Sequence, residues 1–121
     1  MVQMALKARA ELAKDKLEIE VVNMRFAKPL DGELLKEIFA RHTNILTIED
    51  NVITGGFGSA ILEFMNQNKI QGKNVLVHGL PDKFIEHATP EELYEDLKLD
   101  GKGIASIIRE FMISKEKVIT N

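Results

Sequence analysis

The feature that most constrains this chain is a glycine-rich junction from Thr47 to Ser59, which reads T-I-E-D-N-V-I-T-G-G-F-G-S. An apolar run from Ile45 to Ile48 ends in two acidic residues, and apolar side chains at helical spacing follow the glycines. This pattern predicts a strand that leads into a helix across a tight turn. Because glycine has no Cβ, Gly55, Gly56 and Gly58 let the backbone pass close to a ligand or to another part of the fold.

The composition is that of one globular domain. The chain has 121 residues, 45% of them apolar, and a net charge of −3. Lys and Arg residues are scattered along it, which argues against nucleic acid as the main partner. It has no cysteine, which excludes disulfides and cysteine zinc sites, and no apolar run approaches the roughly 18 residues of a membrane span. We therefore expect a cytoplasmic protein with neither nucleic acid nor membrane as a partner.

Helical and strand-like patterns alternate along the chain. Apolar residues three or four apart predict helices, and short apolar runs or strict alternation predict strands. We expect helices over Val2–Lys14, Gly32–Arg41 and Phe57–Asn68, a fourth that begins with the capping box Thr89–Glu92 and a fifth that begins near Asp100, and strands over Leu17–Met24, Asn44–Glu49 and Asn74–His78. Asp31 is expected to cap the second helix.

The order of these elements predicts the fold class. Helices that alternate with strands indicate an α/β domain, here a three-layer α/β/α arrangement around a mostly parallel sheet. Residues 79–82 (Gly-Leu-Pro-Asp) are expected to stop the third strand. The domain is expected to span residues 1–113, and residues 114–121 read as a polar tail in which Val118 and Ile119 have some strand character.

The glycine-rich junction has two interpretations. A helix N-terminus can bind a phosphate or another anion. The sequence G-G-F-G-S is neither a dinucleotide-binding fingerprint nor a P-loop, and Glu49 and Asp50 just before it would repel phosphate. Close packing of the helix on the strand is therefore the favoured interpretation.

Glu49 and Asp50 are the acidic candidates for chemistry. The carboxyl end of a strand is where α/β proteins place general acids, general bases and metal ligands. Adjacent residues of a strand point to opposite faces, however, so the two carboxylates do not easily converge. We therefore favour a role in which one of them caps the glycine-rich turn.

His78, Asp82 and His87 form the only His/Asp cluster in the sequence. A metal site needs a third or fourth ligand, and none lies at a useful spacing. We interpret His78 as a hydrogen-bonded structural residue and His87 as a surface or interface residue. There is no Gly-x-Ser-x-Gly elbow and no cysteine nucleophile. The residues therefore predict no catalytic, cofactor-binding or metal-binding side chain.

Five motifs in order nevertheless resemble one family. They are Asn23-x-Arg25-Phe26-x-Lys28-Pro29-Leu30-Asp31, Thr47-x-Glu49-Asp50-Asn51, Gly55-Gly56-Phe57-Gly58-Ser59, Gly79-Leu80-Pro81-Asp82-x-Phe84-Ile85-x-His87 and Leu99-Asp100-x-x-Gly103-Ile104. Together they resemble the C-terminal, transketolase-like domain of 1-deoxy-D-xylulose-5-phosphate synthases, over about residues 5–111. Each motif alone is weak, and the series of five is specific.

The resemblance implies a parent enzyme. That enzyme is a transferase that uses thiamine diphosphate and magnesium to join pyruvate to glyceraldehyde 3-phosphate with release of carbon dioxide, in the synthesis of isoprenoid precursors. In the family the cofactor lies between the first two domains, so the resemblance implies no cofactor or magnesium on this chain. The third domain packs against the upstream domains and supports a homodimer. On this basis the residues expected at a domain or dimer interface are Glu49, Asp50, Gly55, Gly56, Gly58, His78, Asp82 and His87.

The N-terminus departs from the family pattern. In the family an apolar strand precedes the first helix and lies inside the sheet, and this chain begins at the helix. We therefore interpret the chain as a domain that lacks its first strand. The unpaired edges that this leaves would have to be covered, by a rearrangement of strands, by Val118 and Ile119 of the tail, or by a second copy of the chain.

Three alternatives stay open. The chain could be the equivalent domain of another thiamine-diphosphate enzyme, either transketolase or the β subunit of pyruvate dehydrogenase. It could be a stand-alone interaction module that kept the fold without the activity. It could also bind a small phosphorylated metabolite at the glycine turn, which predicts a saturable thermal shift. We expect no such shift.

Overall fold

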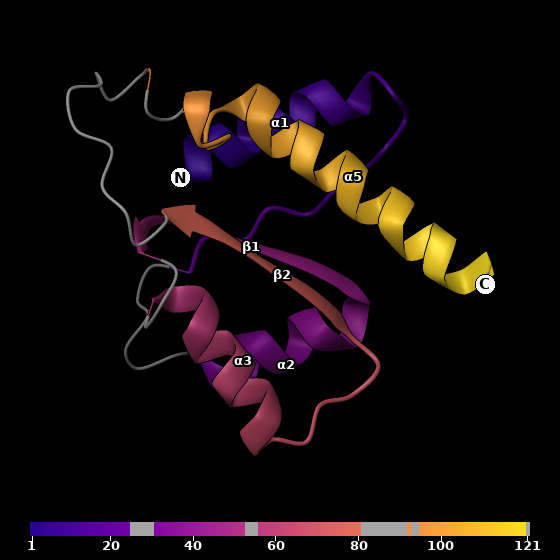
Figure 1. Ribbon diagram of the computed structural model, residues 1–121. Coiled ribbons are helices and arrows are strands. Elements are labelled where there is room, and N and C mark those ends of the chain that lie inside the picture. The colour runs from indigo at the N-terminus through magenta and orange to yellow at the C-terminus, as the bar shows by residue number, and fades with distance from the viewer. Residues whose placement is uncertain (25–30, 53–55, 81–91, 93–94, 121) are drawn as a thin grey trace. The chain divides into compact units, whose positions relative to one another are not determined.

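The computed structural model describes residues 1–24, 31–52, 56–80, 92 and 95–120. The chain forms two compact units, one of Met1–Asn23 with Lys83–Asn121 and one of Met24–Asp82. In the described residues the first unit is helical, and the second combines a small sheet with helices (Figure 1). No helix in the described part of the chain is long and apolar enough to cross a membrane.

The second unit contains a parallel sheet of two strands. Strand β1 (Asn44–Val52) pairs with β2 (Asn74–Leu80), with Asn44 opposite Asn74 and Ile48 opposite His78. At the start of the pair, Nδ2 of Asn74 donates to Oδ1 of Asn44 over 2.8 Å. Both strands are longer than the sequence predicts, because the ladder continues through the acidic residues and through residues 79–80.

The ladder is irregular where the two acidic residues lie. Val52 is the next residue of β1 in register, opposite Leu80, so residues 49–51 of β1 face only Gly79 of β2. A bulge of this kind bends a strand and changes the direction of its side chains. The Asp50 side chain lies outside the described residues, so the expectation that Glu49 and Asp50 point to opposite faces stays a prediction.

Helices α2 (Gly32–Arg41) and α3 (Phe57–Gln67) pack on one side of these strands. Their buried residues Leu35, Phe39 and Ile61 form the core of this unit. Partly buried side chains from the strands, from α3 and from the segments between these elements surround that core: Met24, Ile45, Phe57, Phe64, Met65, Ile70 and Val75. The helices form where the apolar spacing predicts them, and the Asp31 side chain accepts a hydrogen bond from the Leu34 N–H over 3.1 Å, which confirms the predicted cap.

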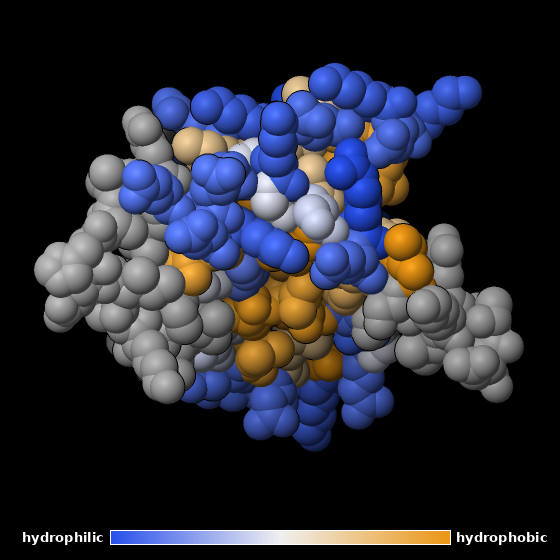
Figure 2. All heavy atoms as spheres, turned by 45° about the horizontal axis from the view of Figure 1, so that its top comes forward, coloured by the Kyte–Doolittle hydropathy of each residue, from blue (hydrophilic) through white to orange (hydrophobic). Residues whose placement is uncertain are grey.

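The first unit packs two helices together. Ala8 and Leu12 of α1 (Val2–Ala13) are fully buried, as are Ile104 and Ala105 of α5 (Gly101–Thr120). The helices approach so closely that a Cβ on Gly101 would lie 2.6 Å from Cβ of Lys7. Hydrophilic side chains cover most of the visible surface of this helix pair (Figure 2).

The start of α5 explains one of the five motifs. Oδ1 of Asp100 accepts a hydrogen bond from the Gly103 N–H over 2.8 Å, and its backbone carbonyl accepts one from Ile104 over 2.9 Å. A Cβ on Gly103 would lie 2.5 Å from Cα of Lys98, so only glycine fits. The predicted helix start near Asp100 is confirmed. Residues 89–91 of the other predicted helix start lie outside the described residues.

The predicted strand over Leu17–Met24 is wrong. These residues have no strand structure, although Leu17, Ile19 and Val21 are half-buried and Glu18 and Glu20 are exposed. The alternation in the sequence therefore predicts correctly which of these side chains are half-buried and which are exposed. It cannot report pairing, because a strand also needs a partner, and the sheet in the described residues contains only β1 and β2.

The strand character assigned to Val118 and Ile119 is also wrong. Both residues lie in α5, which continues to Thr120. The stretch Lys115–Lys117 is rich in residues with good helix propensity, so the helix continues through it. Val118 and Ile119 therefore do not add a strand to the sheet, and this way of covering an open edge is excluded.

Candidate functional site: the junction between β1 and α3

The glycine-rich junction connects β1 to the N-terminus of α3. Gly56 is the N-cap residue of α3, and having no side chain it makes no side-chain cap. The first N–H groups of a helix have no partner within the helix, so α3 needs acceptors from elsewhere. Residues 53–55, including Gly55, lie outside the described residues.

Glu49 supplies those acceptors from the strand. Its Oε2 accepts a hydrogen bond from the Phe57 N–H over 2.5 Å, and its Oε1 accepts one from the Gly58 N–H over 3.4 Å. Only 7% of Glu49 is exposed. A carboxylate at a helix N-terminus also interacts favourably with the helix dipole. The prediction that one of the two acidic residues caps the turn is therefore confirmed, with Glu49 as that residue.

Gly58 is the point where α3 comes closest to the sheet. A Cβ at this position would lie 2.4 Å from Cγ1 of Val77 on β2 and 2.7 Å from Oγ1 of Thr47 on β1. Real Cβ atoms are not found at such distances, so the helix can lie against both strands only with glycine here. Close helix–strand packing, the favoured interpretation of the glycines, is confirmed for Gly58.

Thr47 is a residue of this site to which the sequence assigns no role. It is 4% exposed, and its Oγ1 has no hydrogen-bond partner among the described residues. Thr47 and Glu49 are two residues apart on β1, next to the same end of α3. An unpaired buried hydroxyl is costly. No local signal could reveal it, because it depends on how closely Gly58 approaches.

The structure describes only some of the other predicted site residues. His78 lies in β2, partly buried, opposite Ile48. Asp50 belongs to β1, with its side chain outside the described part, and Asp82 and His87 also lie outside it. Within the described ranges no three His, Cys, Asp or Glu residues come together as metal ligands would.

The described residues of the junction do not fit thiamine diphosphate with its magnesium ion. A diphosphate needs free donors, and the two N–H groups at the start of α3 already bind Glu49. The magnesium ion needs several oxygen ligands in octahedral arrangement, and Glu49, the one acidic residue whose side chain is described here, already binds these N–H groups. The arrangement of the described residues at this junction therefore holds the fold together and offers no place for that cofactor.

Comparison with known proteins places these features in a family. The family model "Transketolase, C-terminal domain" matches residues 1–104. The chain is also similar to curated proteins named 1-deoxy-D-xylulose-5-phosphate synthase. It is 50% identical to that of Vibrio vulnificus (strain CMCP6) over 105 residues, which are 87% of this chain and 17% of the relative. It is 47% identical to that of Syntrophus aciditrophicus (strain SB) over 108 residues, 89% of this chain and 17% of the relative.

A solved structure has the same fold. It is named "Split gene transketolase, inactive beta4 tetramer" and matches 93% of this chain and 36% of its own, with a TM-score of 0.81 and 28% identity. The predicted α/β class with a parallel sheet is thus confirmed. This chain spans about a sixth of the length of the curated relatives. With the family model covering most of its length, the chain belongs to the transketolase C-terminal domain family.

Proposed function

We propose that this chain is the C-terminal domain of a 1-deoxy-D-xylulose-5-phosphate synthase. The curated relatives that it matches at 47–50% identity bear that name. The split-gene transketolase is only 28% identical, which favours the synthase over transketolase as the parent. The parent enzyme then joins pyruvate to glyceraldehyde 3-phosphate, releases carbon dioxide and uses thiamine diphosphate and magnesium.

Within that enzyme the domain is a structural module with no reacting group of its own. One observation carries this proposal: Glu49, the acidic residue at the carboxyl end of a parallel strand, is buried and binds the first N–H groups of α3. A carboxylate in that position caps the helix and is not directed at a substrate. We expect no cofactor on this chain and no turnover by it alone.

The partners in this proposal are the upstream domains of the same cytoplasmic enzyme and a second copy of it in a homodimer. Asp50, Gly55, Gly56, His78, Asp82 and His87 are proposed to lie near that interface. Glu49 and Gly58 are buried in their own unit, so they would act by shaping the junction. The name of the split-gene transketolase describes that protein as inactive and tetrameric, which supports both self-association and lack of activity.

Complementation tests this proposal. The chain alone, supplied with pyruvate, glyceraldehyde 3-phosphate, thiamine diphosphate and Mg²⁺, should release no carbon dioxide above background. The upstream part of the Vibrio vulnificus relative should bind this chain and gain synthase activity from it. Turnover by the chain alone, or an upstream part that neither binds it nor gains activity, would contradict the proposal.

A stand-alone interaction module is the second candidate. It makes a different prediction for the same experiment. A stand-alone module would leave the activity of the upstream part unchanged and would bind an unrelated protein instead.

A further inference from the structure

We propose that the junction between β1 and α3 is an oxyanion-binding site that is occupied by the chain's own Glu49 carboxylate. Without that carboxylate, the site would take a tetrahedral oxyanion such as inorganic phosphate. The native chain should therefore bind no phosphate here. This inference rests on the geometry of one unit and does not depend on the proposed function.

The first argument is the set of donors. Phe57 and Gly58 point consecutive N–H groups at the Glu49 carboxylate, at 2.5 and 3.4 Å. Consecutive N–H groups at the N-terminus of a helix are the donors by which proteins bind phosphate and sulfate. The helix α3 runs to Gln67, long enough for its dipole to favour an anion at this end.

The second argument is the unpaired hydroxyl. Oγ1 of Thr47 lies beside Gly58, 2.7 Å from the position of a Cβ there, and it has no partner within the part of the chain that the structure describes. Thr47 itself is almost fully buried, with 4% of its surface exposed. A planar carboxylate fills two donor positions, whereas a tetrahedral anion has further oxygens. The Thr47 hydroxyl can serve as a third donor to such an oxygen.

The third argument is the buried space around the Glu49 carboxylate. Gly58 has no side chain, so no Cβ stands between the Thr47 hydroxyl and the helix. Glu49 is 7% exposed, so its removal leaves a sheltered space lined by donors. Hydrogen bonds to an anion are stronger in such a space than at an exposed helix end.

The experiment is an anion titration of Glu49→Ala. Its melting temperature is measured against inorganic phosphate, with chloride at equal ionic strength as the reference. The matched control is Asp31→Ala, which removes the side-chain cap of α2, where Asp31 is exposed. Phosphate stabilises proteins in general by exclusion from their surface, and the wild type and this control measure that effect.

We expect a saturable rise of several degrees in Glu49→Ala, well above that in the wild type and in Asp31→Ala. Adding Thr47→Val to Glu49→Ala should weaken the apparent phosphate affinity by about tenfold, the loss expected for one hydrogen bond to a charged group. Equal shifts in all variants would overturn the proposal. If Thr47→Val leaves the phosphate affinity unchanged, the hydroxyl does not bind the anion, and the three-donor arrangement is wrong.

Glu49→Ala could also be unfolded in chloride. The same titration then follows refolding by circular dichroism. Refolding in phosphate that chloride does not produce supports the proposal, and a chain that stays unfolded in both salts contradicts it. Glu49→Gln is a further control, because its side-chain oxygen still fills the site and should prevent any specific phosphate effect.

Discussion

Gly58 of α3 and Val77 of β2 lie so close that a single added carbon on the glycine would come within 2.4 Å of the valine Cγ1. This contact fixes the distance between the helix and the sheet of the second unit. It also determines where the first N–H groups of α3 point, and hence where the Glu49 carboxylate must be. Gly58 and Glu49 therefore act together to hold the start of α3 against the sheet.

Gly58→Ala should destabilise the protein. Alanine favours a helix over glycine by about 1 kcal/mol, but forcing a methyl group into a packed core costs roughly 1–3 kcal/mol, and here both Val77 and Thr47 would have to move. We expect a net loss of up to about 2 kcal/mol in the free energy of unfolding in urea. Gly32→Ala is the control, because a Cβ there would lie 3.3 Å from Cε2 of the Phe64 ring, which can shift. A Gly58→Ala protein as stable as Gly32→Ala would contradict the close approach.

Glu49→Ala should cost more than Glu49→Gln. Alanine leaves the Phe57 and Gly58 N–H groups without their acceptor, and loss of a helix cap costs about 1–2 kcal/mol. Glutamine retains an acceptor oxygen and loses only the charge at the helix terminus, worth about 0.3–1 kcal/mol. Urea unfolding in chloride measures both variants. Equal losses would mean that the charge alone, and not the pair of hydrogen bonds, supports the helix.

Thr47→Val should be neutral or slightly stabilising. The hydroxyl is buried without a partner among the described residues, so a valine of similar shape removes the cost of an unpaired polar group. We expect a change between zero and a gain of about 1 kcal/mol in the free energy of unfolding. A loss larger than about 1 kcal/mol would mean that the hydroxyl has a partner in solution, such as a bound water molecule.

The sequence predicts local features of this fold well. Asp31 and Asp100 each come just before an amphipathic stretch, and both cap a helix through hydrogen bonds to residues three positions further on. Such caps depend only on neighbouring residues, so the pattern is sufficient to find them. The strand-to-helix order around the glycines was predictable for the same reason.

Features that depend on distant residues were not predictable. Leu17–Met24 alternates like a strand but has no ladder, because pairing depends on a partner that the segment itself does not specify. For the candidate site, Glu49 caps α3 from β1, eight positions before Phe57, and a local pattern does not say which of two adjacent acids reaches the helix. The unpaired hydroxyl of Thr47 depends on Gly58, eleven positions away in the chain, which no local pattern encodes.

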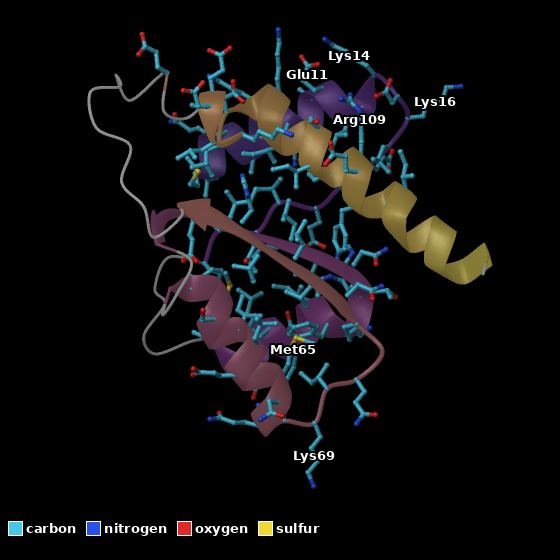
Figure 3. The ribbon with its side chains drawn as sticks, in the orientation of Figure 1. Glu11, Lys14, Lys16, Met65, Lys69 and Arg109 are labelled. Carbon is cyan, nitrogen blue, oxygen red and sulfur yellow. The ribbon has the colours of Figure 1, made fainter. Side chains whose placement is uncertain are left out.

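The ends of two helices offer a way to stabilise the protein. Lys16 after α1 and Lys69 after α3 have φ angles of 60° and 54°, the left-handed conformation that favours glycine. Both occupy the same position in a Schellman motif, since Leu17 N–H donates to the Leu12 carbonyl and Ile70 N–H donates to the Met65 carbonyl. The labelled side chains of Lys16 and Lys69 extend away from their units (Figure 3).

Lys69→Gly should therefore raise stability, by about 0.5–1 kcal/mol, because glycine adopts this conformation without the steric cost that a Cβ brings. Lys16→Gly should do the same, and the two gains should add because the residues belong to separate motifs. Lys36→Gly is the control with the opposite sign: Lys36 is exposed in the middle of α2, where glycine costs about 1 kcal/mol. The urea unfolding midpoints of the three variants measure these changes in stability. If Lys69→Gly is destabilised as much as Lys36→Gly, then Lys69 does not hold the left-handed conformation in solution, and α3 ends differently.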